Sequence, residues 1–349
     1  MTQRTLAGLI ALPLVVALIV VAWVVPLPYT IYSPGPTVNV LGKFGGKPIV
    51  QVKGAKTYAD GGELRMTTVS ETTREAQLGL WTLLHAWISN DSAVYPRDVA
   101  YPDTTGTAEN DRKEGQVEMA TAQDSAIAAA FNQLGKKVDE VSVAAVEKGA
   151  PASGKLEAKD VILKVGDQAV TTPDQAVKAV QSAKPGDVIE LTVRRGAKTL
   201  TQSVKAGSKE GKAYLGVSLG ATYHFPFDVK INLDPAIGGP SAGLMMALSV
   251  YDTLTPGSLT DSNHVAGTGT IDGDGTVGPI GGIQQKIPGA RNDGAQLFLV
   301  PAGNCQDIDG ADHGDMRLAK VTRLSDAITT VETWSKNHDA KLPTCGGTQ

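Results

Sequence analysis

The longest apolar segment lies at the N-terminus, where residues 6–27 (LAGLIALPLVVALIVVAWVVPL) contain no charge. As a helix this segment would extend about 33 Å, enough for the roughly 30 Å hydrocarbon core of a bilayer. Arg4 precedes the segment and the next basic residue is Lys43. This asymmetry predicts a cytoplasmic N-terminus and an extracytoplasmic C-terminal part. The end of the segment has no small-x-small cleavage site, so we expect an uncleaved anchor in residues 1–28 rather than a signal peptide.

Residues 29–115 predict a β-rich region with one helix. Short apolar or alternating runs at 49–52 and 64–69 are typical of strands, and apolar positions recur at helical spacing over 78–88. The SPGP segment at 33–36 predicts a turn, and the polar stretch 101–115 predicts a loop. We find no catalytic constellation in this region.

The sequence pattern of residues 116–207 differs from that of the preceding region. An Ala-rich helix is expected over 119–134, ending at Gly135, followed by strands, turns and one helix that Thr172-Pro173-Asp174 opens. The stretches VSVAAVEKGAPASGKLEAKDVILKVGDQAVTTPDQAVKAV and PGDVIELTVRRG resemble a PDZ domain of the bacterial protease type. That resemblance implies recognition of an extended peptide at a sheet edge. The family's carboxylate-binding loop is not visible, except for a faint likeness at Leu134-Gly135, and a spacer domain without a ligand is the alternative.

The first candidate for chemistry is the heptad IGGPSAG at 237–243, which leads into the apolar helical pattern LMMALSVYD. Ser241 would lie in the first turn of that helix, near free backbone N–H groups and the positive end of the helix dipole. Such surroundings suit a nucleophile whose attack creates an oxyanion. The alternative for this heptad alone is an ordinary turn that caps a helix.

The second candidate is GPIGGIQQKI at 278–287, which contains Lys286. Considered without the first candidate, Lys286 would be interpreted as an ordinary solvated surface lysine. Three segments in order, GPSAG, AGTGTIDGDGTVGPIGGIQQK and RNDGAQLFLVPAGN, resemble the proteolytic domain of the Lon family, over about residues 215–334. The resemblance implies that Ser241 is the nucleophile and Lys286 the general base, and that the hydroxyl of Thr268 helps to orient the lysine.

A lysine acts as a base only when it is neutral, so its pKa must fall below the usual value of about 10.4. Apolar neighbours such as Ile280, Ile283 and Ile287 could desolvate the amine. The backbone N–H groups of Ser241 and Ala242 are candidate oxyanion donors, and no cofactor is expected for this chemistry.

Together these patterns predict a multi-domain α+β protein with four parts. The parts are a cytoplasmic tip and transmembrane helix (1–28), a β-rich region (29–115), a PDZ-like domain with its preceding helix (116–207) and a Lon-type proteolytic domain (210–345). The order resembles the membrane-anchored, PDZ-containing Lon-like proteases of Gram-positive bacteria and actinobacteria. It implies an ATP-independent serine endopeptidase in the cell membrane that cleaves exported or membrane-tethered proteins, with a homo-oligomer as an expected assembly.

Composition narrows the possible partners of this protein of 349 residues. With 32 basic and 36 acidic residues, its net charge of −4 argues against nucleic acid as the main binding partner.

Residues 149–155 match the start of a phosphate-binding loop, but Leu156 replaces the Ser or Thr that would hold magnesium, so we expect no ATP binding. The two cysteines, Cys305 and Cys345, lack metal-ligand spacing, and in an exported protein they are candidates for a disulfide, with two free thiols as the alternative.

Two other functions compete with the peptidase. GPSAG also satisfies the GxSxG pattern of α/β-hydrolases, and His264, His313 and His338 follow it, but the preceding INLDPAIGG is a poor strand. The second alternative is a catalytically silent scaffold that recruits a partner through its PDZ-like domain.

Overall fold

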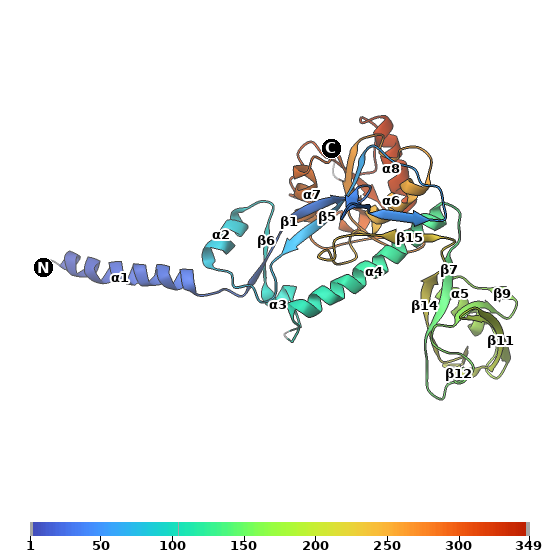
Figure 1. Ribbon diagram of the computed structural model, residues 1–349. Coiled ribbons are helices and arrows are strands. Elements are labelled where there is room, and N and C mark those ends of the chain that lie inside the picture. The colour runs from blue at the N-terminus through green and yellow to red at the C-terminus, as the bar shows by residue number, and fades with distance from the viewer. Residues whose placement is uncertain (1–2, 104, 347–349) are drawn as a thin grey trace. The chain divides into compact units, whose positions relative to one another are not determined.

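The computed structural model describes residues 3–103 and 105–346, so residues 1–2 of the predicted anchor and residue 104 of the predicted loop lie outside the described residues. The protein divides into two compact units (Figure 1). The first comprises Met1–Leu134 and Phe227–Gln349, and the second comprises Gly135–Pro226.

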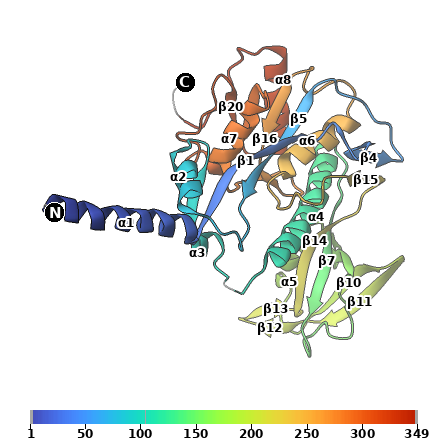
Figure 2. The same ribbon diagram turned by 60° about the vertical axis from the view of Figure 1, so that its left-hand side comes forward.

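A mixed sheet forms the centre of the first unit (Figures 1 and 2). Its order is β20-β19-β16-β5-β1-β6, with parallel pairing from β20 to β5 and antiparallel pairing from β5 to β6. The strands are β1 (Tyr29–Asn39), β5 (Glu63–Glu71), β6 (Ala93–Pro96), β16 (His264–Gly267), β19 (Leu297–Pro301) and β20 (Arg317–Val321). Residues 29–115 therefore share one sheet with the C-terminal part, whereas the sequence pattern predicts a separate region.

Helices α6 (Gly243–Leu254) and α4 (Ala108–Gln133) pack against each other in this unit. Helix α6 is apolar on almost every side and is buried along nearly its whole length. Helix α4 begins in the stretch expected to be a loop, because the hydroxyl of Thr107 accepts a hydrogen bond from the Asn110 N–H and caps it. The first unit also contains α2 (Leu80–Ile88), α3 (Arg97–Ala100), α7 (Ile283–Asn292), η1 (Ala302–Asn304) and α8 (Leu324–Lys336).

The SPGP segment lies inside β1 instead of forming a turn. The pairing of β1 with β5 shifts register between Pro34 and Thr37, so an irregularity in the ladder accommodates both prolines. Smaller antiparallel pairs complete the first unit: β2 (Lys43–Phe44) with β3 (Lys47–Pro48), β4 (Val50–Lys53) with β15 (Asp228–Ile231), and β17 (Thr270–Ile271) with β18 (Val277–Gly278).

The second unit is a sheet with one helix, α5 (Pro173–Gln181), and its own apolar core. The strand order is β11-β10-β8-β7-β14, with β9 paired to β8. The strands are β7 (Asp139–Val146), β8 (Val161–Val165), β9 (Gln168–Ala169), β10 (Val188–Arg195), β11 (Lys198–Lys205) and β14 (Val217–Tyr223); β12 (Gly207–Lys209) and β13 (Lys212–Tyr214) pair separately. Strand β14 follows residue 210, where we expect the proteolytic domain to begin, so the second unit extends further along the sequence.

The predicted transmembrane anchor requires a correction. Helix α1 (Gln3–Val24) contains most of the apolar segment, and its described side chains are those of residues 9–21 and 23. Among the residues that the structure describes, no helix is long and apolar enough to cross a bilayer. The transmembrane helix in the predicted fold class is therefore wrong, and so is the predicted single-pass localisation in the cell membrane.

A disulfide joins Cys305, just after η1, to Cys345 near the C-terminus, with their Cα atoms 5.0 Å apart. The two residues are 40 positions apart in the sequence. In the chain-entropy model, closing a loop of this length stabilises the folded state by about 4 kcal/mol. The bond ties the C-terminal segment to the turn that follows β19.

A pair of carboxyl groups connects the end of α6 to the loop before β5. The carboxyl of Asp252 is hydrogen-bonded to that of Asp60, and burial raises the pKa of Asp252 to about 7. Asp60 is also partly buried, but hydrogen bonds from Ser258, Thr260 and the Gly62 N–H hold its pKa below the usual value. Asp252 is therefore the protonated partner below neutral pH.

We expect the raised pKa of Asp252 to make folding stability depend on pH. The protonated carboxyl stabilises the fold, so its contribution is complete below the ordinary pKa of 3.8 and is lost as the pH rises to about 7. Between these two pH values, the free energy of unfolding should fall by about 1.4 kcal/mol per pH unit. Asp252→Asn keeps an acceptor for the Leu259 N–H and cannot ionise, so denaturant unfolding between pH 4 and 8 should show a flatter profile for this variant. Parallel profiles for the variant and the wild type would contradict the prediction.

Candidate active site

Ser241 and Lys286 meet in the first unit although they are 45 residues apart. The Nζ of Lys286 lies 2.9 Å from the Oγ of Ser241. It also donates a hydrogen bond to the backbone carbonyl of Thr67 on β5, at 2.8 Å. The amine therefore has a fixed position between a hydroxyl and a carbonyl, and a neutral amine there can accept the hydroxyl proton.

Burial controls the protonation of this lysine. The residue is only 3% exposed, and desolvation lowers the pKa of its amine from 10.5 to about 8. Its helix neighbours Ile283 and Ile287 are buried too, as expected from the sequence. Among the described residues, no acidic group pairs with this amine, so the charged form has little compensation.

The position of Ser241 depends on a short segment after β16. The Ser241 carbonyl accepts hydrogen bonds from the Gly269 N–H at 2.8 Å and from the Thr268 hydroxyl at 3.0 Å. The Leu244 N–H in turn donates to the Gly269 carbonyl at 3.0 Å. Thr268 is fully buried and its hydroxyl contacts the backbone of Ser241, whereas the sequence resemblance implies a role in orienting Lys286.

Helix α4 supports the loop before Ser241 from another direction. The Gly239 N–H donates to the Gly115 carbonyl at 2.8 Å, and Gly239 has a left-handed φ of +86°. A Cβ on Gly238 would lie 3.1 Å from the Gly115 backbone, so both glycines allow this close approach. The polar stretch before the Ala-rich segment therefore contributes to the site, a role for which the sequence gives no signal.

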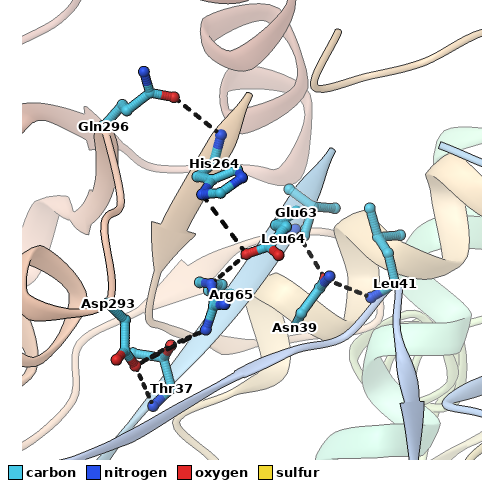
Figure 3. Close-up of polar contacts among 9 residues, drawn as sticks. All are labelled: Thr37, Asn39, Leu41, Glu63, Leu64, Arg65, His264, Asp293 and Gln296. Carbon is cyan, nitrogen blue, oxygen red and sulfur yellow. Dashed lines mark hydrogen bonds and ion pairs between the residues drawn. The ribbon is translucent and has the colours of Figure 1, made fainter. Parts of the chain in front are cut away.

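Lys286 lies one turn into α7, and both ends of this helix are held. At its start, Gly282 has a left-handed φ of +69°, and a Cβ there would lie 2.8 Å from a methyl of Val69. At its end, Asp293 accepts hydrogen bonds from the Thr37 N–H at 3.1 Å and hydroxyl at 2.7 Å (Figure 3).

Figure 3 also shows the polar side chains that continue from Thr37 across the sheet. Arg65 donates to the Thr37 hydroxyl at 2.7 Å and pairs with Glu63, whose carboxylate lies 3.8 Å from Nδ1 of His264. These contacts tie β1, β5 and β16 to the C-terminal end of α7. His264, one of the histidines considered for a hydrolase triad, therefore lies next to Glu63 in this group of polar side chains.

The other two histidines also have partners away from Ser241. Nδ1 of His313 lies 2.9 Å from the Met316 carbonyl, and Nε2 of His338 lies 3.1 Å from Oδ1 of Asn263. The geometry therefore favours a serine–lysine pair over the α/β-hydrolase alternative. Within the described residues there is also no cluster of three or more His, Cys, Asp or Glu side chains that could hold a metal ion.

A cavity of about 670 Å³ opens onto the Ser241–Lys286 pair. Its walls are largely apolar and include Phe44, Ile49, Met66, Met119 and Ile237. Residues Thr67–Ser70 of β5 also line it. Strand β16 pairs with β5 only as far as Met66, so beyond that residue β5 has no partner on this side among the described strands. The cavity thus combines apolar walls with a strand edge that no described strand pairs with after Met66.

The second unit has an apolar groove of its own, of about 100 Å³, between α5 and the edge strand β14. Ala176 and Val180 line it from the helix, and Leu219 lines it from the strand. Gly216, just before β14, has a left-handed φ of +74°, and a Cβ there would lie 2.1 Å from Ala150. Leu134-Gly135, where the sequence has a faint likeness to a carboxylate-binding loop, does not line this groove. Leu215-Gly216 does line it, and this pair is the sequence feature from which the groove could have been predicted.

Comparison with known proteins finds matches to two family models. Residues 227–331 match the family model of the Lon protease (S16) C-terminal proteolytic domain, and residues 116–206 match the PDZ domain model. Lon protease 1 of Herpetosiphon aurantiacus is 34% identical over 37% of this chain and 15% of its own length. Lon protease 1 of Bacillus subtilis is 31% identical over 38% of this chain and 16% of its own length.

The PDZ domain of the SdrC-like protein of Listeria monocytogenes is 26% identical and covers 23% of this chain and 85% of that structure, with a TM-score of 0.22. The protein spans only about a sixth of the length of the curated relatives it matches. Residues 227–331 are therefore similar to a proteolytic domain of serine-type peptidases, and residues 116–206 are similar to a PDZ domain.

The buried amine leads to a prediction about stability. Because the pKa of Lys286 is lowered to about 8, the unfolded state binds more protons than the folded one between pH 8 and 10.5. Stability should therefore rise with pH in this window, by up to about 3 kcal/mol. Lys286→Met removes the titrating group with little change in volume, so it should be more stable than the wild type at pH 7, with the difference shrinking by pH 10. Denaturant unfolding at both pH values measures this, and a variant less stable at pH 7 would contradict it.

Proposed function

We propose that this protein is an ATP-independent serine endopeptidase in which neutral Lys286 activates Ser241. The observation that carries the proposal is the 2.9 Å contact between the hydroxyl and the amine of a lysine that is almost completely buried. Removal from water favours the neutral amine and leaves its lone pair free for a proton. The match of residues 227–331 to a proteolytic domain supports a peptide bond as the substrate.

The reaction follows from the positions of these groups. As Ser241 Oγ attacks the peptide carbonyl, Lys286 takes its proton, and the ammonium then protonates the departing amine. A water molecule releases the acyl group, again with Lys286 as the base. The N–H groups of Ser241 and Ala242 make no hydrogen bond to any residue that the structure describes, which leaves them able to stabilise the oxyanion.

The cavity indicates how a substrate would bind. An extended peptide segment can pair with the edge of β5 after Thr67, where no described strand pairs with it, and this brings the peptide backbone past the Ser241 hydroxyl. Apolar side chains of that segment would fill the pocket beside Met66, Met119 and Ile237. Since a substrate must be extended to pair in this way, unfolded or flexible proteins are the expected substrates.

The dyad predicts a specific pattern of activity. Ser241→Ala and Lys286→Met should each reduce the cleavage of a denatured, fluorescently labelled protein at least about a thousandfold. In the wild type, kcat/KM should rise with pH and level off above about 8, because the neutral form of Lys286 is the active one. His264→Ala serves as the matched control and should keep its activity. Cleavage by Ser241→Ala at the wild-type rate would refute the dyad, and a requirement for added ATP would refute the motor-free reaction.

We further propose that the groove beside β14 binds an extended peptide, since β14 is an edge strand and apolar side chains of α5 face it. Val180→Asp introduces a charge into the groove, so it should weaken the binding of peptides with an apolar C-terminal residue more than tenfold. Lys178→Asp, on the exposed side of the same helix, is the control and should bind normally. Fluorescence anisotropy with the full-length protein measures this, and equal affinity for Val180→Asp and the wild type would contradict the proposal.

A further inference from the structure

A buried asparagine holds the loop that precedes the helix of the base. Asn304 is 2% exposed and ends the short helix η1. Its Oδ1 accepts a hydrogen bond from the Ile280 N–H at 2.9 Å, and its Nδ2 donates to the Ile280 carbonyl at 2.8 Å. The same Nδ2 donates to Asp307 at 2.9 Å. Both polar groups of one backbone residue are therefore held by a single planar amide.

The held residue lies in a segment without regular structure. Residues 279–282 connect β18 to α7 and belong to no helix or strand. The amide of Asn304 supplies the hydrogen bonds that a neighbouring strand would otherwise supply. The turn and the segment are also in close contact, because a Cβ on Gly303 would lie 3.0 Å from the ring of Pro279.

The position of this segment is transmitted directly to Lys286. The Lys286 N–H donates to the Gly282 carbonyl at 3.1 Å, and Gly282 is only two residues after Ile280. Ile280 packs against the same apolar cluster as Ile283 and Ile287, which flank the base on α7. A shift at residue 280 would therefore move the amine away from its contacts of 2.8 and 2.9 Å.

Asn304 is itself fixed by the residue that follows it. Cys305 forms the disulfide with Cys345, and Cys345 packs against the apolar cluster that contains Ile283 and Ile287. The turn that carries Asn304 is thus covalently joined to a segment that covers the helix of the base.

We propose that Asn304 is a positioning residue for the serine–lysine pair, which sets the location and burial of the Lys286 amine through its two hydrogen bonds to Ile280. This inference rests on the proposed function, because it assumes that Lys286 acts as the base for Ser241. Asn304 touches neither of these side chains in the contacts of the described residues, so its effect is indirect.

The test uses the rate at which a fluorophosphonate probe labels Ser241 in the full-length protein, measured from pH 6 to 10.5. Asn304→Ala should slow labelling at pH 8 by about ten- to a hundredfold. It should also move the midpoint of the pH profile upward from about 8 toward 10.5, because a loosened loop admits water to the amine. A merely structural loss of stability would lower the labelled amount without moving the midpoint.

Two further variants keep the test decisive. Asn263→Ala also removes an asparagine that donates to loop carbonyls, those of Thr260 and Asp261, and should leave both rate and midpoint unchanged. Asn304→Asp covers the case in which Asn304→Ala does not fold. It keeps the acceptor for the Ile280 N–H but turns an oxygen toward the Ile280 carbonyl and Asp307, so it too should label slowly with a raised midpoint.

Each outcome has one interpretation. If Ser241→Ala loses labelling while the folded Asn304 variants label at the wild-type rate with the midpoint near 8, the positioning role is overturned and the dyad stands. Labelling that persists in Ser241→Ala would overturn the proposed function and this inference together. Slow labelling with a raised midpoint in the Asn304 variants alone supports the role assigned here.

Discussion

The amine of Lys286 is the group on which the arrangement of the first unit depends. It must be close to Ser241, held by the Thr67 carbonyl and largely removed from water at the same time. Removal from water lowers its pKa to about 8, as the proposed role of a base requires, but it also costs stability at neutral pH, because a charge is then buried with little compensation. The surrounding elements hold the lysine in this unfavourable arrangement, so the proposed function and the stability of the fold are opposed at this residue.

Three segments far apart in the sequence meet that requirement together. Strand β5 supplies the carbonyl, the loop before α6 supplies the hydroxyl, and α7 supplies the amine. Two side chains hold α7 from outside the pair, Asn304 through Ile280 at its start and Asp293 through Thr37 at its end. The region 29–115 is therefore part of the first unit, because its strands complete the sheet and its β5 lines the cavity.

Several elements were predictable from local pattern, and others were overridden by packing. The helix after IGGPSAG and strands β7, β8, β10 and β11 of the second unit follow from apolar periodicity and turn residues, and the structure contains them. The SPGP segment predicts a turn, yet an irregular ladder with β5 keeps it extended. The apolar N-terminal segment predicts a membrane span, but no helix of the described residues meets the length and polarity that a span needs. Strand β14 joins the second unit because it pairs with β7, a long-range contact that no local signal reports.

By itself, the sequence determined the candidate residues for the chemistry, since GPSAG and GGIQQK are short motifs whose order singles out Ser241 and Lys286. The tertiary structure alone decided the distance between the Ser241 hydroxyl and the Lys286 amine. It also decided the burial of the amine and its hydrogen bond to the Thr67 carbonyl. A backbone carbonyl has no identity in the sequence, and desolvation is a property of everything packed around a group. For the same reason Asn304 is one asparagine among several in the sequence, and only folding brings its amide to Ile280.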